Sequence, residues 1–476
     1  MEAILPLSAT VSPVTTRPAA AAEPTVPSIW LPLSFIVTGL LALLTAVGWM
    51  IAQPDLLTTY HYNQNIIALT HLVVLGWICS VVIGATYQLV PVALETKLYS
   101  ERLAKCQFVF HLVGFVGMVW MFKTWNMKQV GHFGSILGLG AGLFIYNLAR
   151  TLLRVQKWNI VATALASSLA WFTLSILAGL SIAAGKCSYD STEGAAVASG
   201  VRTLIAGLRS MGAFMSRFDA ISAMHAHAHL GLIGLFTMLV VGVSYKLVPM
   251  FTLSEIQNRR RAGLSIALLN AGLLGAFLSI LLRSPFKFVF GMVVCAALGM
   301  YGWEIAAVLK ARKRAALDWG VRSFITALCL LAPLGLLGAV LAWPRLPLNV
   351  FTGQLENLYG FLGAFGFVTL AIIGMLHKIV PFLAWFKTYS PHVGRFRVPT
   401  LAALYSEHLQ RIGYWTWLTG LAAAGAGILL QSDVVARLGV IALSFTLLML
   451  AVNIAKILSH VLQPKLSPLP GRAKSS

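Results

Sequence analysis

The sequence predicts an all-α, polytopic membrane protein, and three observations support this prediction. The chain has 476 residues, of which 58% are hydrophobic and only 10% are charged, whereas soluble chains carry about 25% charged residues. Its mean hydropathy is +0.82. The apolar residues gather in runs long enough to cross the roughly 30 Å hydrocarbon core of a bilayer. This composition excludes a soluble enzyme, a disordered chain and a nucleic-acid binder, and it makes the lipid bilayer a partner of the chain.

Twelve apolar runs follow one another along the chain. Helices are expected there because a helix satisfies its backbone hydrogen bonds within one segment in lipid. Residues 1–27 are predicted to be a disordered tail, residues 463–476 a second tail, and the outer loop 185–224 has room for an interfacial helix around residues 201–214. The predicted spans are residues 28–52, 66–91, 107–123, 131–153, 157–183, 225–249, 263–283, 286–309, 321–342, 357–384, 412–430 and 437–462.

The distribution of Lys and Arg predicts the orientation. An even number of spans places both termini on one side, and 25 of the 35 basic residues fall on that side. Because basic residues collect on the cytoplasmic side, we expect a multi-pass protein of a bacterial-type inner (plasma) membrane with both termini and both tails in the cytoplasm. The net charge of +21 is then a topology signal, and no nucleic-acid partner is predicted.

An internal repeat joins the second, sixth and tenth spans. Five anchor positions recur with the same spacings of 5, 8, 3 and 4 residues. These spans each come second in successive groups of four, so we predict three four-helix pseudo-repeats over residues 28–156, 157–309 and 310–462. The anchors are His71, Gly76, Gly84, Tyr87 and Pro91; His229, Gly234, Gly242, Tyr245 and Pro249; and Phe361, Gly366, Gly374, His377 and Pro381.

Histidines gather on the predicted outer side. Histidine within a bilayer is rare and is a functional hypothesis by default. His225 and His229 share one helix face, whereas His227 points about 160° away at 100° per residue. Neutral imidazole binds haem iron, copper or zinc; the alternative is a set of buried, hydrogen-bonded histidines. The six outer-side histidines are His61, His71, His132, His225, His227 and His229.

These residues resemble the haem-copper oxidase superfamily, which includes subunit I of terminal oxidases and the large subunit of nitric oxide reductases. His71 and its surroundings are similar to the helix-2 haem-ligand segment of nitric oxide reductases and C-type oxidases, and residues 227–234 resemble the H-x-H haem-ligand motif. The sequence departs from the family at the tenth span, where Tyr359 and Phe361 stand in place of imidazoles, and at span 263–283, which has no histidine. Because of these departures, the set of copper ligands that the family carries is expected to be incomplete in this sequence.

The resemblance implies a divergent, stand-alone relative of subunit I. His71 and His229 are the predicted axial ligands of a b-type haem, bound non-covalently because no C-x-x-C-H motif is present. His227 is the predicted ligand of a second haem or metal centre. His225, His132 and His61 are candidate metal ligands, with copper as the second candidate cofactor. No catalytic residue is assigned.

The predicted function is respiratory electron transfer or the handling of oxygen or nitric oxide. If the chain is an enzyme, it is an oxidoreductase of the terminal oxidase or nitric oxide reductase type, with a cytochrome or quinol donor or a second subunit as partner. The alternative is a carrier or assembly scaffold for copper or haem without redox catalysis. A secondary transporter is disfavoured, since the repeated spans read as continuous whereas transporter sites lie at broken helices.

Overall fold

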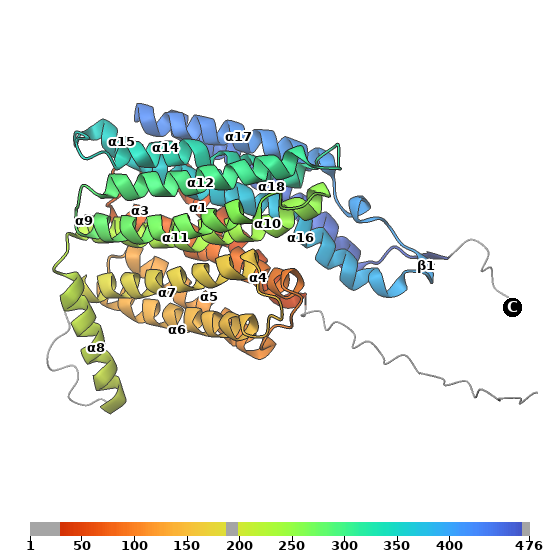
Figure 1. Ribbon diagram of the computed structural model, residues 1–476, viewed down its shortest axis with the longest axis horizontal. Coiled ribbons are helices and arrows are strands. Elements are labelled where there is room, and N and C mark those ends of the chain that lie inside the picture. Colours follow the sequence, from red (N-terminus) through yellow and green to blue (C-terminus); the bar gives the residue numbers. More distant parts are fainter. Residues whose placement is uncertain (1–28, 187–198, 469–476) are drawn as a thin grey trace, which may run out of the picture.

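The computed structural model describes residues 29–186 and 199–468. The predicted tail at residues 1–27, the end of the predicted tail at 463–476 and residues 187–198 of the predicted outer loop lie outside this range. The described helices run side by side as one elongated bundle (Figure 1).

Eleven helical segments among the described residues are long and apolar enough to cross a membrane, so the predicted all-α, polytopic class is confirmed. Three short elements, η1, η2 and η3, are π-helical and are treated below. The α-helices are α1 (Trp30–Ala52), α2 (Asp55–Thr58), α3 (Gln64–His71), α4 (Ser80–Ala93), α5 (Glu101–Lys123), α6 (Met127–Leu152), α7 (Ile160–Lys186), α8 (Ser199–Met215), α9 (Ala220–His229), α10 (Met238–Thr252), α11 (Arg259–Leu281), α12 (Lys287–Lys310), α13 (Trp319–Cys329), α14 (Leu331–Leu341), α15 (Val350–Phe361), α16 (Leu370–Thr388), α17 (Glu407–Leu430) and α18 (Asp433–Leu462).

Each of the twelve predicted spans has a helical counterpart, with boundaries that differ by a few residues. The eleven membrane-crossing segments do not include α17, which covers the predicted span 412–430. Residues 413–420 are rich in Gly, Tyr, Trp and Thr, and these residues lower the mean hydropathy of the helix even where its polar first turns are left out. The count of twelve spans therefore stays a prediction.

Two helix pairings recur along the chain. The first helix of each predicted unit packs on the second, as α1 on α4, α7 on α10 and α13 on α16. The third and fourth helices form a hairpin, as α5 with α6, α11 with α12 and α17 with α18. Whether the three units are copies of one another remains a prediction.

The repeated glycines lie where the first two helices of a unit approach closely. A Cβ on Gly84 would lie 2.6 Å from Cβ of Phe35 on α1, and one on Gly374 would lie 2.7 Å from the carbonyl oxygen of Gly320 on α13. Gly242 of α10 lies in the same way against Ala164 of α7. Small residues are needed at such contacts between membrane helices, so any larger side chain would separate the pair.

Each repeated span contains a π-helical segment that begins directly after its first anchor. The segments are η1 (Leu72–Cys79), η2 (Leu230–Thr237) and η3 (Leu362–Thr369). They change the helical period without breaking the helix. The third contacts both others, and Trp77 of η1 donates a hydrogen bond from Nε1 to Oγ1 of Thr369 on η3 over 3.0 Å. Because π-helical turns are rare and often mark functional sites, they direct attention to the residues just before them.

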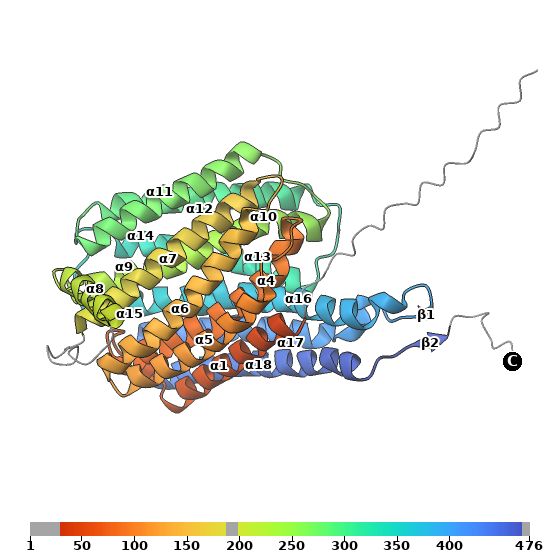
Figure 2. The same cartoon turned by 90° about the horizontal axis from the view of Figure 1, so that it is seen from below.

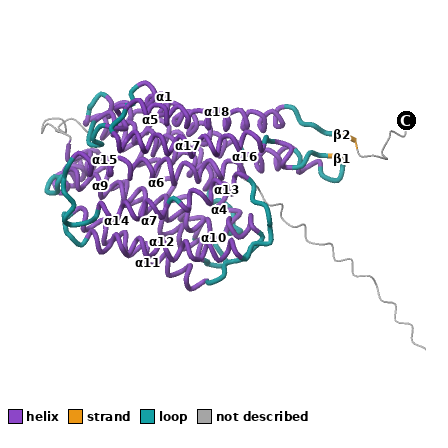
Figure 3. Tube along the Cα trace, turned by 90° about the horizontal axis from the view of Figure 1, so that it is seen from above, coloured by secondary structure: helices purple, strands orange, loops and turns teal. Residues whose placement is uncertain are grey.

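The two ends of the bundle differ. At one end, here called the α8 end, α8 runs across the direction of the other helices (Figures 1 and 2) and packs on α7. This helix covers the predicted residues 201–214. At the opposite end, α16 and α18 project and lead to a two-stranded antiparallel sheet of β1 (Phe396–Arg397) and β2 (Ser467–Pro468), as Figure 3 shows. Two short 3₁₀ turns, η4 (Ser390–His392) and η5 (Leu401–Leu404), lie between α16 and α17.

Candidate cofactor-binding site

His71 ends α3 directly before the π-helical segment η1. Its Nδ1 lies 2.7 Å from the carbonyl oxygen of Ile67 one turn earlier, and this bond places the imidazole proton on Nδ1. Nε2 then keeps its lone pair, which is the arrangement that a metal-ligating histidine needs. The ring of Phe122 on α5 packs against the imidazole with centroids 4.5 Å apart. His71 is therefore held in an orientation suited to coordination.

His227 lies on α9 and packs against α7 of its own predicted unit. It is close enough to His71 for the charges of the two side chains to interact. Its Nδ1 is buried and has no hydrogen-bond partner among the described residues. The ring packs against the bare backbone of Gly179 on α7, where an added Cβ would lie 2.9 Å from Cε1 of His227. A buried polar atom without a partner costs about 1–3 kcal/mol, so this imidazole is the one whose environment is incomplete.

His229 faces a different neighbour. Its Nδ1 lies 2.7 Å from the carbonyl oxygen of His225, which repeats the arrangement at His71. Its Nε2 lies 3.4 Å from the hydroxyl of Tyr359 on α15, and the two rings are stacked with centroids 5.8 Å apart. The structure therefore places His71 near His227, and places His229 beside the third predicted unit. The sequence, by contrast, predicts His71 and His229 as the two haem ligands.

His61 and His225 come together at the α8 end. Their Nε2 atoms lie 2.8 Å apart, and Glu356 on α15 joins them so that one ligand atom from each residue lies within 4.8 Å of the others. Nδ1 of His61 lies 3.2 Å from Oδ1 of Asn357. Burial lowers the pKa of His61 from its ordinary value of 6.5, although the hydrogen bond to Asn357 raises it. A neutral imidazole is the form that binds metal ions.

His132 does not join either group. It is exposed near the start of α6, and its Nδ1 lies 3.2 Å from Oε1 of Gln129 on the same helix. Sequence reasoning also did not find Glu356, Asn357 and Gly179. A signal existed for Glu356, since a carboxylate at the edge of a membrane span is rare, but the predicted span 357–384 began one residue after it.

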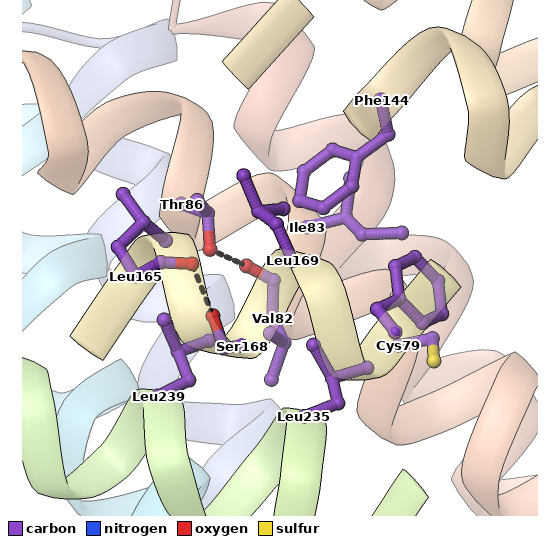
Figure 4. A pocket seen from close by; sticks show the side chains of 11 residues that line it. Cys79, Val82, Ile83, Thr86, Phe144, Leu165, Ser168, Leu169, Leu235 and Leu239 are labelled. Atoms are coloured by element: carbon purple, nitrogen blue, oxygen red, sulfur yellow. Dashed lines mark hydrogen bonds between the residues drawn. The ribbon is translucent and has the colours of Figure 1, made fainter. Parts of the chain in front are cut away.

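A small apolar cavity separates the first predicted unit from the second. Its volume is about 10 Å³, at most room for one water molecule, and it is lined by residues of η1, α4, α6, α7, η2 and α10. Figure 4 shows that its walls are mostly aliphatic and aromatic. The two wall hydroxyls, those of Thr86 and Ser168, donate hydrogen bonds to carbonyls of their own helices over 2.6 Å and 2.8 Å. The cavity therefore presents an apolar surface.

The cavity lies on the same two helices as His71 and His227. Cys79 and Leu235 line it, and each follows one of the two histidines by eight residues. Eight residues span at most about 12 Å along a helix. The two imidazoles and the cavity thus lie along one interface between the first and second predicted units.

A solved structure shares this fold. It is the cryo-EM structure of a haem-copper terminal oxidase dimer, which matches with a TM-score of 0.63, 12% sequence identity, and coverage of 94% of this chain and 86% of that chain. At this identity the match shows a common fold. The chain is therefore an all-α membrane protein with the architecture of a haem-copper terminal oxidase chain.

A family model also matches part of the sequence. Residues 15–127 match the family described as cytochrome c and quinol oxidase polypeptide I, and this stretch contains His71. The chain is therefore similar to subunit I of the haem-copper oxidase superfamily over one stretch of sequence and in its fold, which agrees with the resemblance described from the sequence. No curated protein matches the chain.

This superfamily implies haem and copper, and the residues fit the two groups differently. At the interface between the first two predicted units, two imidazoles lie on helices that line an apolar cavity, and Nδ1 of His227 is buried without a hydrogen-bond partner among the described residues. These are donor groups of the kind that a haem iron takes. The copper set that the resemblance implies does not fit, because α11 contains no histidine.

Proposed function

We propose that this chain is an integral membrane haem protein, related to haem-copper oxidase subunit I, that holds one b-type haem between His71 and His227. The observation that carries the proposal is the buried Nδ1 of His227, which has no hydrogen bond of ordinary geometry among the described residues, on an imidazole that interacts electrostatically with His71 and lies by the backbone of Ser175. This pairing revises the axial pair His71 and His229 that the sequence favoured. His229 then remains beside Tyr359, where it is the candidate ligand of a second centre.

Each residue of the site has a part in binding. His71 supplies Nε2, since its Nδ1 is held by the carbonyl of Ile67, and His227 supplies the opposite nitrogen. Gly179 leaves the space that the His227 ring occupies. A bound haem supplies one-electron redox chemistry, and the protein sets its potential through axial ligands, hydrogen bonding and burial. The apolar walls of the neighbouring cavity exclude water and so lower the local dielectric.

This site suits electron transfer better than reduction of a substrate at a haem-copper pair. If His71 and His227 both ligate a bound haem, no ligand position would be left on it for a substrate. We therefore propose a role in respiratory electron transfer, with a cytochrome or quinol donor or a second subunit as partner. Oxygen or nitric oxide handling, the other role that the sequence predicts, would need an open ligand position at the second centre. The positive charge distribution supports a plasma-membrane protein whose termini face the cytoplasm, which would place the α8 end outside.

The test is spectroscopic. We would record reduced-minus-oxidised absorption spectra of the purified protein, quantify haem as the pyridine haemochrome, and measure metals on the same sample. Low-spin b-type bands are expected in the wild type and should be lost in His71→Ala and His227→Ala. His132→Ala, which alters an exposed histidine, is the control and should retain them.

Three results decide between the alternatives. Loss of the low-spin bands in His229→Ala, with the bands intact in His227→Ala, would restore the pairing predicted from the sequence. Absence of haem together with reversible, stoichiometric copper would favour the carrier or scaffold. Absence of both would leave the histidines structural and the likeness to the oxidases one of fold. Elution as a single symmetric species in size-exclusion chromatography shows that each variant is folded.

A further inference from the structure

Three residues from distant parts of the chain meet at the α8 end of the bundle. His61 lies in the loop between α2 and α3, His225 on α9 and Glu356 on α15. One ligand atom from each lies within 4.8 Å of the other two, and Oε2 of Glu356 lies 3.9 Å from Nδ1 of His61. In terms of the predicted units, each residue comes from a different one. The cluster does not include His71, His227 or the cavity, and so it is separate from the proposed haem site.

The two imidazoles face each other through the same kind of atom. Nε2 of His61 and Nε2 of His225 are 2.8 Å apart, and their ring centroids are 5.1 Å apart. Two tetrahedral zinc ligands at 2.0–2.1 Å from the ion lie about 3.3 Å apart. The pair therefore needs to open by only about 0.5 Å to hold an ion between its nitrogens.

A second layer of hydrogen bonds fixes the tautomer of His61. The amide nitrogen of Asn357 donates to the carbonyl oxygen of Thr59 over 2.8 Å and to Oε1 of Gln354 over 3.1 Å. Oδ1 of Asn357 is then left to accept the Nδ1 proton of His61 over 3.2 Å. With the proton on Nδ1, the lone pair lies on Nε2 and points at His225. Metal-ligating histidines commonly have such a partner on the other nitrogen.

The same contacts tie the loop to α15. Nε2 of Gln354 donates to the carbonyl oxygen of Thr58 over 2.6 Å. The backbone that carries His61 is therefore anchored to the helix that carries Glu356. The ligand Glu356 and the residues that support His61, Gln354 and Asn357, all come from this one helix. His225 is anchored as well, because its carbonyl oxygen accepts the hydrogen bond from His229.

The donor set indicates the class of ion. Two imidazole nitrogens and one carboxylate suit divalent first-row transition metals such as Zn²⁺ and Cu²⁺, whereas Ca²⁺ and Mg²⁺ prefer oxygen ligands. Three protein ligands leave a fourth position for water or an exchanging ligand. Asp219 and Lys287 both interact with the charge of His225 and have opposite signs, so the negative charge that offsets the ion comes from Glu356.

We propose that His61, His225 and Glu356 form a binding site for a divalent transition-metal ion of the Zn²⁺ and Cu²⁺ class at the α8 end. The site is distinct from the proposed haem site and does not depend on it. The bound ion would cross-link the loop before α3 to α9 and α15.

The test uses the full-length protein in detergent, purified with a tag that contains no histidine. The protein is treated with a chelator, incubated with Cu²⁺ or Zn²⁺ in separate samples, and freed of excess metal by gel filtration. Bound metal and haem are then measured on the same sample. The wild type and His132→Ala should retain about one ion per chain. His61→Ala and His225→Ala should weaken binding at least about tenfold, with haem content unchanged.

Electron paramagnetic resonance of the Cu²⁺ sample gives a second readout. Couplings to two imidazole nitrogens are expected, and removal of either histidine should leave one. Glu356→Gln should weaken binding while both nitrogen couplings remain. Because His61 lies in a loop, its alanine variant remains informative if His225→Ala fails to fold.

The proposal is wrong if the wild type retains no ion, or if both histidine variants retain as much as the wild type. Couplings to a single nitrogen in the wild type would also overturn it, since His61 and His225 would then be a hydrogen-bonded pair. Unaltered affinity in Glu356→Gln would overturn the assignment of the third ligand. The haem measurement on the same samples shows whether the proposed haem site fails independently.

Discussion

Substituting Gly179 with alanine tests whether the ring of His227 belongs to the haem site. An added Cβ would lie 2.9 Å from Cε1 of His227, whereas ordinary contacts to a Cβ begin at 3.4 Å, so the imidazole has to move by the difference of about 0.5 Å. Metal sites tolerate deviations of only about 0.2 Å in ligand distance. We therefore expect haem affinity to fall about 10–100-fold, which is the range seen when the support of a metal ligand is lost.

The assay compares reduced-minus-oxidised spectra and haem content of Gly179→Ala with those of the wild type. The low-spin bands should decrease and high-spin features should appear in the remaining haem. Gly179→Leu should abolish binding, because its larger side chain fills the place of the imidazole. Gly142→Ala on α6 is the matched control, since an added Cβ there meets nothing within 4 Å.

One result would refute this reasoning. If Gly179→Ala and Gly179→Leu both keep the haem content and low-spin bands of the wild type, His227 is not a ligand. The pairing of His71 with His229 would then be preferred, because His229 faces Tyr359 and is not in contact with Gly179.

Three further predictions concern stability, measured as the free energy or midpoint of thermal unfolding in detergent. Glu304→Gln should lower the free energy of unfolding by about 3–5 kcal/mol. The buried carboxylate of Glu304 lies 2.6 Å from the guanidinium of Arg261, which would lose its charge partner; an unchanged unfolding midpoint would contradict this. Trp77→Phe should cost about 1–3 kcal/mol, because the buried hydroxyl of Thr369 loses its donor; the double variant with Thr369→Val should recover part of that loss. The backbone N–H and the hydroxyl of Ser222 donate hydrogen bonds to Asp219 and hold the pKa of its carboxyl below the ordinary 3.8. The contribution of Asp219 to the free energy of unfolding is therefore present above pH 3.8 and is lost as the pH falls through the lower folded-state pKa. Asp219→Asn should show a flatter acid dependence than the wild type, and identical pH profiles would contradict the assignment.

The positions of the helices were predictable because they depend on local composition. Uncharged runs of about 20 residues have few alternatives in a bilayer, and every predicted span has a helical counterpart. The helix α17 is the one predicted span that is absent from the set of membrane-crossing segments, because Gly, Tyr, Trp and Thr residues over positions 413–420 lower its mean hydropathy. The close approach at Gly84 was also predictable, because glycines spaced eight apart lie on nearly one face.

The grouping of the histidines was only partly predictable. His71 and His229 occupy equivalent positions in the repeat, and the structure gives both the same hydrogen bond from Nδ1 to the carbonyl four residues earlier. Equivalence within a repeat does not say which neighbour a side chain faces. His227 lies two residues from His229, packs against α7 and interacts electrostatically with His71, and that difference changes the proposed haem pair.

The sequence by itself determined the class of protein, the approximate helix boundaries, the repeated motif and the resemblance to oxidase subunit I, because each depends on residues close together in the chain. Only the tertiary structure brought Glu356 to His61, since they are 295 positions apart and meet through packing of different helices. It also revealed the π-helical segments, whose altered period changes which residues share a face. A periodicity of 3.6 residues cannot predict that change, so the orientation of side chains around these segments had to come from the folded bundle.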